Sequence, residues 1–138
     1  MVELLIGKKG TGKTKSLVDS VNKASGEAKG NVVFITNTVS RNMYDIKYDV
    51  RMVSTEDFEI SSYAEFSGFI EGIISGNFDI TNIFVDAFFK IVNTTELEGM
   101  KEFLERIEKV SEKFSVDFVF SLSMDAADAP DYMKKYIK

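Results

Sequence analysis

The sequence contains no cysteine, no histidine and no glutamine, and it has only one proline among its 138 residues. Without cysteine there can be neither a disulfide framework nor a cysteine-based zinc site. Without histidine the chain lacks the usual general base and the commonest protein ligand of transition metals. A Ser-His-Asp hydrolase is therefore excluded, and a transition-metal enzyme is not expected.

The chain also lacks long apolar runs and an excess of basic residues. The opening apolar run, residues 2–6, is too short for a membrane span or for the apolar region of a signal peptide. A cytoplasmic protein without a membrane span is therefore expected. The net charge is −5, whereas nucleic-acid binders usually carry a positive balance, so DNA and RNA are not expected partners.

What the sequence does contain is the apolar content of a folded domain. Hydrophobic residues make up 44% of the chain and include twelve Phe. No repeat or linker divides it, so residues 1–138 are expected to form a single domain. Short apolar runs alternate with amphipathic stretches, which is typical of an α/β fold with a parallel sheet. Five strands are predicted, at residues 2–6, 32–36, 49–53, 80–85 and 116–122.

Helices are predicted between these strands. The first covers residues 13–24. A capping box, in which Ser62 accepts a hydrogen bond from a backbone amide and Glu65 reaches back, predicts the start of a second helix. The same box at residues 95–98 predicts the start of a third helix, with an apolar stripe from Leu97 onward against a charged outer face.

The most informative stretch is rich in glycine and lysine and reads GKKGTGKT. It matches G-x-x-x-x-G-K-[ST] at every fixed position, between an apolar strand and an amphipathic helix. Glycines let backbone amides approach an anion without a Cβ in the way, and a helix N-terminus adds a favourable partial charge. A phosphate-binding loop is therefore predicted; the alternative is a turn with solvated lysines. Its candidate residues are Gly7, Lys8, Lys9, Gly10, Thr11, Gly12, Lys13, Thr14 and Lys15.

With this loop the chain resembles the P-loop NTPase superfamily, in which residues 7–14 correspond to the Walker A motif. The resemblance implies a three-layer α/β/α fold and a Mg²⁺-ATP ligand. Lys13 would reach the β- and γ-phosphates, and the Thr14 hydroxyl would ligate Mg²⁺. It also implies an apolar strand that ends in an acidic residue, and residues 82–86 (NIFVD) supply one. Asp86 thus resembles the Walker B aspartate, catalytic together with Lys13; a core strand with an acidic end is the alternative.

The spacing between Thr14 and Asp86 leaves room for an intervening strand and helix, as in the RecA-like branch of the superfamily. That resemblance implies that residues 116–122 form a strand between the Walker A and Walker B strands. Ser121 or Ser123, at its end, would sense the γ-phosphate, although small polar residues at a strand end need have no such role. The chain also resembles small bacterial P-loop proteins sometimes labelled twitching-motility ATPases, a label that does not fit a chain without histidine.

Two function classes remain open. Asp86 begins the sequence DAFF, which lacks the glycine of the GTPase motif D-x-x-G, so ATP is expected in preference to GTP. Ala87 stands where RecA-like ATPases commonly carry a Glu that orients the attacking water. Weak or partner-dependent hydrolysis is therefore expected, in a nucleotide-dependent switch or small ATPase. Its partner would be another protein or, in a homo-oligomer, a second copy of the chain. The alternative is a small-molecule or nucleoside kinase.

A polar loop after the second strand is another candidate for recognition. Loops beyond the C-terminal ends of parallel strands form the functional rim of such sheets. This loop could read a base, a substrate or a protein partner, or it could be an ordinary surface loop. Its candidate residues are Arg41, Asn42, Tyr44 and Asp45.

Overall fold

The computed structural model describes residues 1–40 and 43–138. Within these ranges, five parallel strands form one sheet in the order β1-β5-β4-β2-β3. The strands are β1 (Val2–Gly7), β2 (Asn31–Thr36), β3 (Arg51–Ser54), β4 (Ile80–Asp86) and β5 (Asp117–Ser123). The predicted α/β class with a parallel sheet is confirmed, and each predicted strand is present with its ends displaced by no more than two residues.

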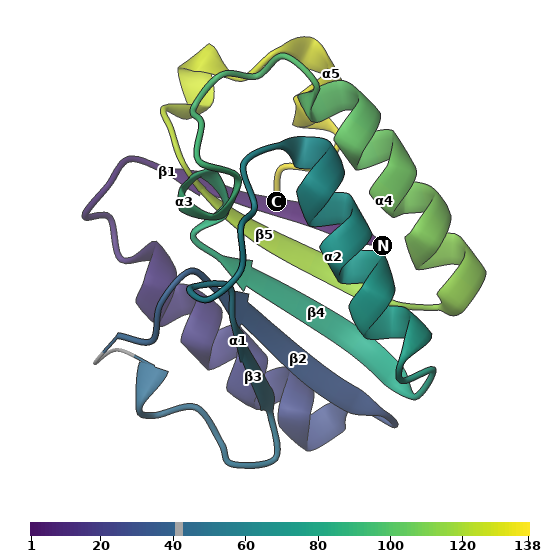
Figure 1. Cartoon of the computed structure of the whole chain (residues 1–138). Helices are drawn as coiled ribbons and strands as arrows, with labels where there is room; N and C mark the ends of the chain where they lie inside the picture. The colour runs from purple at the N-terminus through teal and green to yellow at the C-terminus, as the bar shows by residue number, and fades with distance from the viewer. Residues whose placement is uncertain (41–42) are drawn as a thin grey trace.

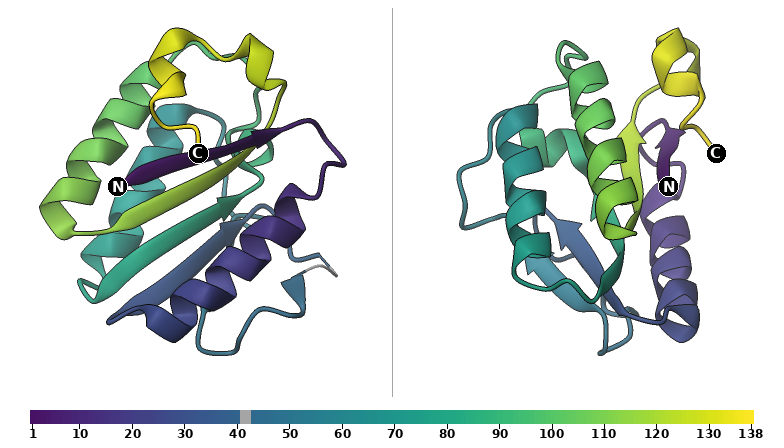
Figure 2. Two further views of the ribbon diagram at one scale, coloured as in Figure 1. Left: turned by 180° about the vertical axis from the view of Figure 1, so that it is seen from behind. Right: turned by 90° about the vertical axis from the view of Figure 1, so that its right-hand side faces the viewer.

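Helices cover both faces of the sheet and complete three layers (Figure 1). One face carries α1 (Lys13–Glu27), and the other carries α2 (Tyr63–Ser75), α3 (Phe88–Val92) and α4 (Met100–Phe114). The right-hand view of Figure 2 shows α1 on one side of the strands and α2 and α4 on the other. A short 3₁₀ turn, η2 (Ala126–Asp128), and α5 (Asp131–Lys134) follow β5. Across the described residues, no helix combines the length and the apolar character needed to cross a membrane.

Two clusters of buried apolar side chains hold the layers together. On the α1 face, Leu17 and Val21 pack with Val32, Phe34 and Phe84 of the central strands. The other cluster joins α2, α3 and α4 to the alternate residues of the same strands. Because neighbouring strand residues point to opposite faces, a sheet covered on both sides needs continuous apolar runs. Those runs are the pattern from which the strands were predicted.

The strand order gathers several chain segments at one edge of the sheet. β5 lies between β1 and β4, the arrangement that the RecA-like resemblance implies. The register sets Gly7 beside Ser123 and Thr36 beside Asp86. Since all the strands are parallel, their C-terminal ends meet at this edge, which is where ligands bind in open α/β sheets.

The predicted start of α2 is confirmed, with one difference in the cap. Ser62 is the N-cap, and its hydroxyl accepts a hydrogen bond from the Glu65 amide at 3.0 Å. The Glu65 carboxylate reaches back to the amide of Ser61, at 2.8 Å, rather than to that of Ser62. The return hydrogen bond of the capping box therefore ends one residue earlier in the chain than the sequence pattern predicts, at Ser61.

The predicted start of the third long helix is wrong. α4 begins at Met100, after Gly99 in the left-handed conformation (φ 94°), so residues 95–98 stay outside the helix. Leu97 belongs to the preceding loop, where its carbonyl accepts a hydrogen bond from the Met100 amide. The reason is the helix α3, which the sequence did not predict. Because α3 follows β4 directly, residues 93–99 are needed to carry the chain from its end to the start of α4.

Candidate functional site

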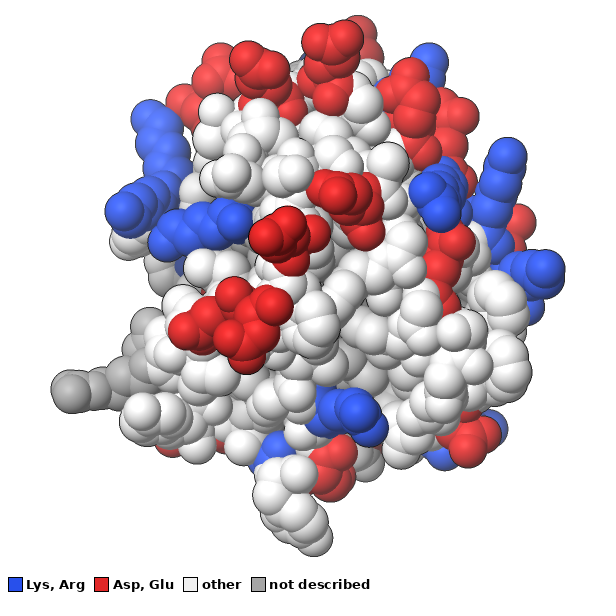
Figure 3. Space-filling model, viewed as in Figure 1, with Lys and Arg blue, Asp and Glu red and all other residues white. Residues whose placement is uncertain are grey.

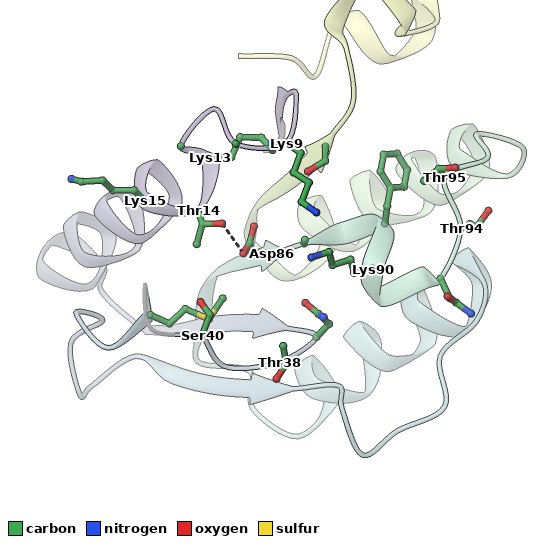
Figure 4. Close-up of a pocket in the computed structure, with 18 residues that line it drawn as sticks. Lys9, Lys13, Thr14, Lys15, Thr38, Ser40, Asp86, Lys90, Thr94 and Thr95 are labelled. Carbon is green, nitrogen blue, oxygen red and sulfur yellow. Dashed lines mark hydrogen bonds between the residues drawn. The ribbon is translucent and has the colours of Figure 1, made fainter.

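A cavity of about 900 Å³ opens at the C-terminal edge of the sheet, between the glycine-rich loop and α3 (Figure 4). Its wall combines the loop after β1, the ends of β2, β4 and β5, and the segment that begins with α3. The loop after β1 and the start of α1 contribute Lys9, Gly10, Gly12, Lys13, Thr14 and Lys15. The segment after β2 contributes Asn37, Thr38, Ser40 and Met43, and the ends of β4 and β5 contribute Asp86, Ala87 and Ser123. The remaining described wall residues are Phe89, Lys90, Asn93, Thr94 and Thr95. The tertiary structure thus brings most of the predicted loop residues and Asp86 to one cavity.

The backbone of the loop favours glycine at two positions, and a third glycine is closely packed. Gly10 and Gly12 have φ values of 86° and 83°, a conformation that residues with a Cβ rarely adopt. A Cβ on Gly7 would lie 2.8 Å from Thr11 Oγ1. That hydroxyl in turn donates a hydrogen bond to the Lys8 carbonyl at 2.7 Å, which closes the loop. Gly10 and Gly12 are therefore conformational requirements of a tight loop, and a side chain at position 7 would displace the Thr11 hydroxyl.

The loop runs directly into α1 without a capping side chain. Gly12 is the N-cap, no side chain accepts from the first turn, and the first turn contains no acidic residue. The first N–H groups of a helix have no partner within it, and they carry a partial positive charge. Because Gly12, Lys13 and Thr14 lie on the cavity wall, this end of α1 is suited to an anion.

Lys13 adds a full positive charge at the same place. Its ammonium group donates to the Lys8 carbonyl at 3.0 Å, which holds it against the loop backbone at the cavity wall. Partial burial lowers the pKa of Lys13 from its usual value, and the negative charge of Asp86 opposes that shift. An anion in the cavity would stabilise the charged form of this side chain.

Asp86 is the point at which three elements meet. Its buried carboxylate accepts a hydrogen bond from Thr14 Oγ1 at 3.2 Å and another from Ser121 Oγ at 2.5 Å. Thr14 belongs to α1, Asp86 ends β4 and Ser121 lies near the end of β5. Ser121 therefore fixes the position of the Asp86 carboxylate without lining the cavity itself. The serine on the cavity wall is Ser123, two residues later. In the described part of the chain, no cluster of three or more Asp, Glu, His or Cys side chains forms a metal site.

Two other predicted lysines are engaged with carboxylates. Lys8 pairs with Asp125, in the segment after β5, at 3.3 Å. Lys15 pairs with Asp19 one turn along α1 at 3.7 Å. All four side chains are well exposed, so these ion pairs contribute little to stability.

The candidate loop after β2 is placed only in part. Arg41 and Asn42 lie outside the described residues. The Tyr44 side chain is exposed, and the Asp45 carbonyl accepts a hydrogen bond from the Asn22 side chain at 2.9 Å. This bond ties the loop to α1 without directing Asp45 to the cavity.

The sequence interpretation missed the wall opposite the glycine loop. Lys90, from α3, and Asn93, which ends that helix, both line the cavity, as do Asn37 and Thr38 after β2. A signal for Lys90 was present: a single lysine stands within the apolar stretch FFKIV, four residues after Asp86. A charged residue inside an otherwise buried stretch is expected to face an opening.

The cavity is basic although the chain is acidic. Among the described wall residues, Asp86 is the sole carboxylate, against the four lysines Lys9, Lys13, Lys15 and Lys90. The whole chain has a net charge of −5. Figure 3 shows acidic side chains along the top and near the centre of the face drawn there, and basic ones at both its left edge, where β1 ends in Figure 1, and its right edge. A basic concave site favours an anionic ligand.

Comparison with known proteins assigns no family. No protein-family profile matches the chain, and no curated protein is similar enough to be a relative. A functional proposal must therefore come from the chemistry of the site itself.

Proposed function

We propose that the cavity binds Mg²⁺-ATP and that the protein is a nucleotide-dependent switch or a slow ATPase. The observation that carries the proposal is the hydrogen bond between Thr14 and Asp86, 3.2 Å long, beside the glycine loop. It joins a hydroxyl at the start of α1 to a carboxylate at the end of β4, next to amides suited to phosphate. These are the groups that the sequence motif requires at one place.

The loop and the start of α1 supply the phosphate site of this proposal. Gly10 and Gly12 allow consecutive backbone amides to turn toward one anion. Lys13 adds the charge that neutralises phosphate oxygens, from the same wall of the cavity. The cavity volume of about 900 Å³ lies within the range of ordinary ligand sites.

Thr14 and Asp86 would hold the magnesium ion. Mg²⁺ prefers oxygen ligands and usually keeps several waters, so one or two protein oxygens plus phosphate oxygens are enough. The hydroxyl and the carboxylate meet this requirement, and Ser121 fixes the carboxylate from β5. When bound, the ion would neutralise charge between the β- and γ-phosphates. ATP is proposed in preference to GTP because the guanine-specific motifs are absent from the sequence.

A second cavity favours the kinase as the alternative function. It measures about 430 Å³ and shares Asn37, Lys90 and Asn93 with the first cavity. Glu56 and Glu59 are on its wall. A kinase needs room for an acceptor beside the γ-phosphate and a carboxylate that can take the proton of its hydroxyl. Formation of ADP that depends on an added alcohol would favour this alternative over the switch.

Replacing Lys13 by Ala tests the nucleotide site. A charge-assisted contact is worth about 1.5–3 kcal/mol, so ATP affinity should fall roughly ten- to a hundredfold. Isothermal titration calorimetry with Mg²⁺-ATP measures the change, and circular dichroism checks that the fold persists. Lys109→Ala, at an exposed position on α4, is the matched control and should bind as the parent does. Equal affinity in Lys13→Ala and the parent would refute the proposal.

Replacing Asp86 by Asn tests the magnesium site separately. The amide keeps the shape of the side chain but removes the negative charge that favours the cation. We expect the gain in ATP affinity on adding Mg²⁺ to shrink by about 10–100-fold, the usual cost of altering a metal site's supporting groups. Titrations of ATP with excess Mg²⁺ and with excess chelator give this gain for each variant. An undiminished magnesium effect would make Asp86 only the acidic end of a core strand.

A further inference from the structure

We propose that Lys90 binds the terminal phosphate of the nucleotide and makes the site select a triphosphate over a diphosphate. This inference rests on the proposed function, because it assumes that the glycine loop holds the remaining phosphates. It adds a contact from the opposite wall of the cavity, which no element of the sequence motif supplies.

The first support is the way in which α3 is anchored. Four of its five side chains, Phe88, Phe89, Ile91 and Val92, are buried in the core, with exposed fractions of 1%, 9%, 3% and 0%. Lys90 is the remaining one, and it lies on the wall of the cavity. The core therefore fixes the backbone from which this lysine extends, while the long side chain keeps freedom to reach a ligand.

The second support is the charge environment of Lys90. Among the described residues, no carboxylate lies within ion-pair distance of its ammonium group, whereas Lys8 and Lys15 each have a partner. Asp86 is the sole carboxylate that the described residues contribute to this cavity, and it already accepts hydrogen bonds from Thr14 and Ser121. Lys90 also lines the second cavity, whose wall includes Glu56 and Glu59, but neither of these carboxylates forms an ion pair with it. Its ammonium group is therefore available to an anionic ligand.

The third support is the order of the groups across the cavity. Figure 4 shows Thr14, Asp86 and Lys90 in succession, from the start of α1 toward α3, and Lys9 points from the loop toward the same region. In the proposed complex Thr14 and Asp86 would hold the magnesium ion, which would neutralise charge on the terminal phosphates. A phosphate that extends beyond the ion toward α3 would meet Lys90, whereas the phosphates held by the loop would not.

Nucleotide selectivity tests this role. Calorimetry would compare Mg²⁺-ADP with the Mg²⁺ complex of the β,γ-imido analogue of ATP, which is not hydrolysed. In Lys90→Ala, affinity for the analogue should fall about tenfold or more, because a charge-assisted contact is lost, while affinity for ADP should stay within about twofold. Lys90→Arg should retain most of the preference for the triphosphate, and Lys109→Ala should match the parent with both ligands.

The outcomes separate this inference from the proposed function. If Lys13→Ala weakens both nucleotides but Lys90→Ala leaves their affinity ratio unchanged, the nucleotide site stands and the role of Lys90 is overturned. An equal loss for both nucleotides in Lys90→Ala likewise overturns it, because that result reports only the general charge of the cavity. If the parent binds neither nucleotide, both proposals fail.

Discussion

Phe88→Ala is expected to lower the free energy of unfolding by about 3–5 kcal/mol, the usual cost of truncating a buried Phe. The Phe88 side chain is 1% exposed. Its ring lies 5.7 Å from that of Tyr63, 5.8 Å from Phe66, 5.2 Å from Phe103 and 5.6 Å from Phe120, between centroids. Removing it leaves a void among rings from α2, α4 and β5 that cannot all move inward. Chemical denaturation followed by circular dichroism measures the loss.

Two further substitutions control this experiment. Phe88→Leu keeps most of the buried volume and should cost clearly less than Phe88→Ala. Phe78→Ala removes a ring that is 71% exposed and stacks on Phe114, so it should cost about 1 kcal/mol or less. A cost below 1 kcal/mol for Phe88→Ala would mean that α3 is not anchored as described, and the fixed position of Lys90 would lose its basis.

ATP hydrolysis by the purified protein is expected to be slow, about 10⁻⁴–10⁻³ s⁻¹, as for small GTPases without their activators. P-loop hydrolysis needs both neutralisation of charge at the γ-phosphate and a group that positions water. Lysines and magnesium can meet the first need. The described cavity wall offers no carboxylate besides Asp86, which is held by Thr14 and Ser121, and Ala87 follows it. Phosphate release at steady state measures the rate.

Ala87→Glu is the companion variant. Because Ala87 lines the cavity, a Glu at this position would extend toward the proposed γ-phosphate and should raise the rate by about tenfold or more. Lys13→Ala controls for contaminating ATPases. Turnover by the parent above about one per second, lost in Lys13→Ala, would contradict the expectation. Glu56 would then be the first residue to test as the group that orients the attacking water. It lines the neighbouring cavity and accepts a hydrogen bond from Thr38, which lines the main cavity, at 3.2 Å.

The strands were predictable because their signal is local. A parallel sheet buried on both faces needs short, continuous apolar runs, and the runs at 32–36 and 80–85 have no polar alternation. The glycine loop was predictable for a related reason. Gly10 and Gly12 adopt positive φ values that few other residues tolerate. The glycines in the sequence therefore indicate this conformation directly.

The start of α4 was not predictable in this way. Residues 95–98 have the residue types of a capping box, and such a box can start a helix in isolation. The chain instead uses them to connect α3 with α4, and Gly99 provides the turn into the helix. A capping side chain stabilises the start of a helix by only about 1 kcal/mol. The burial of α3 in the core therefore outweighs it.

By itself, the sequence determined the α/β class, the approximate strands and the conformation of the glycine loop, since each depends on neighbouring residues. Only the tertiary structure decided which side chains share the cavity. Asp86 meets Thr14 across 72 positions of sequence and Ser121 across 35, and these contacts exist only once β5 lies between β1 and β4. The place of Lys90 was likewise decided by packing, because the burial of its four neighbours in α3 leaves it as the one charged side chain that this helix brings to the cavity.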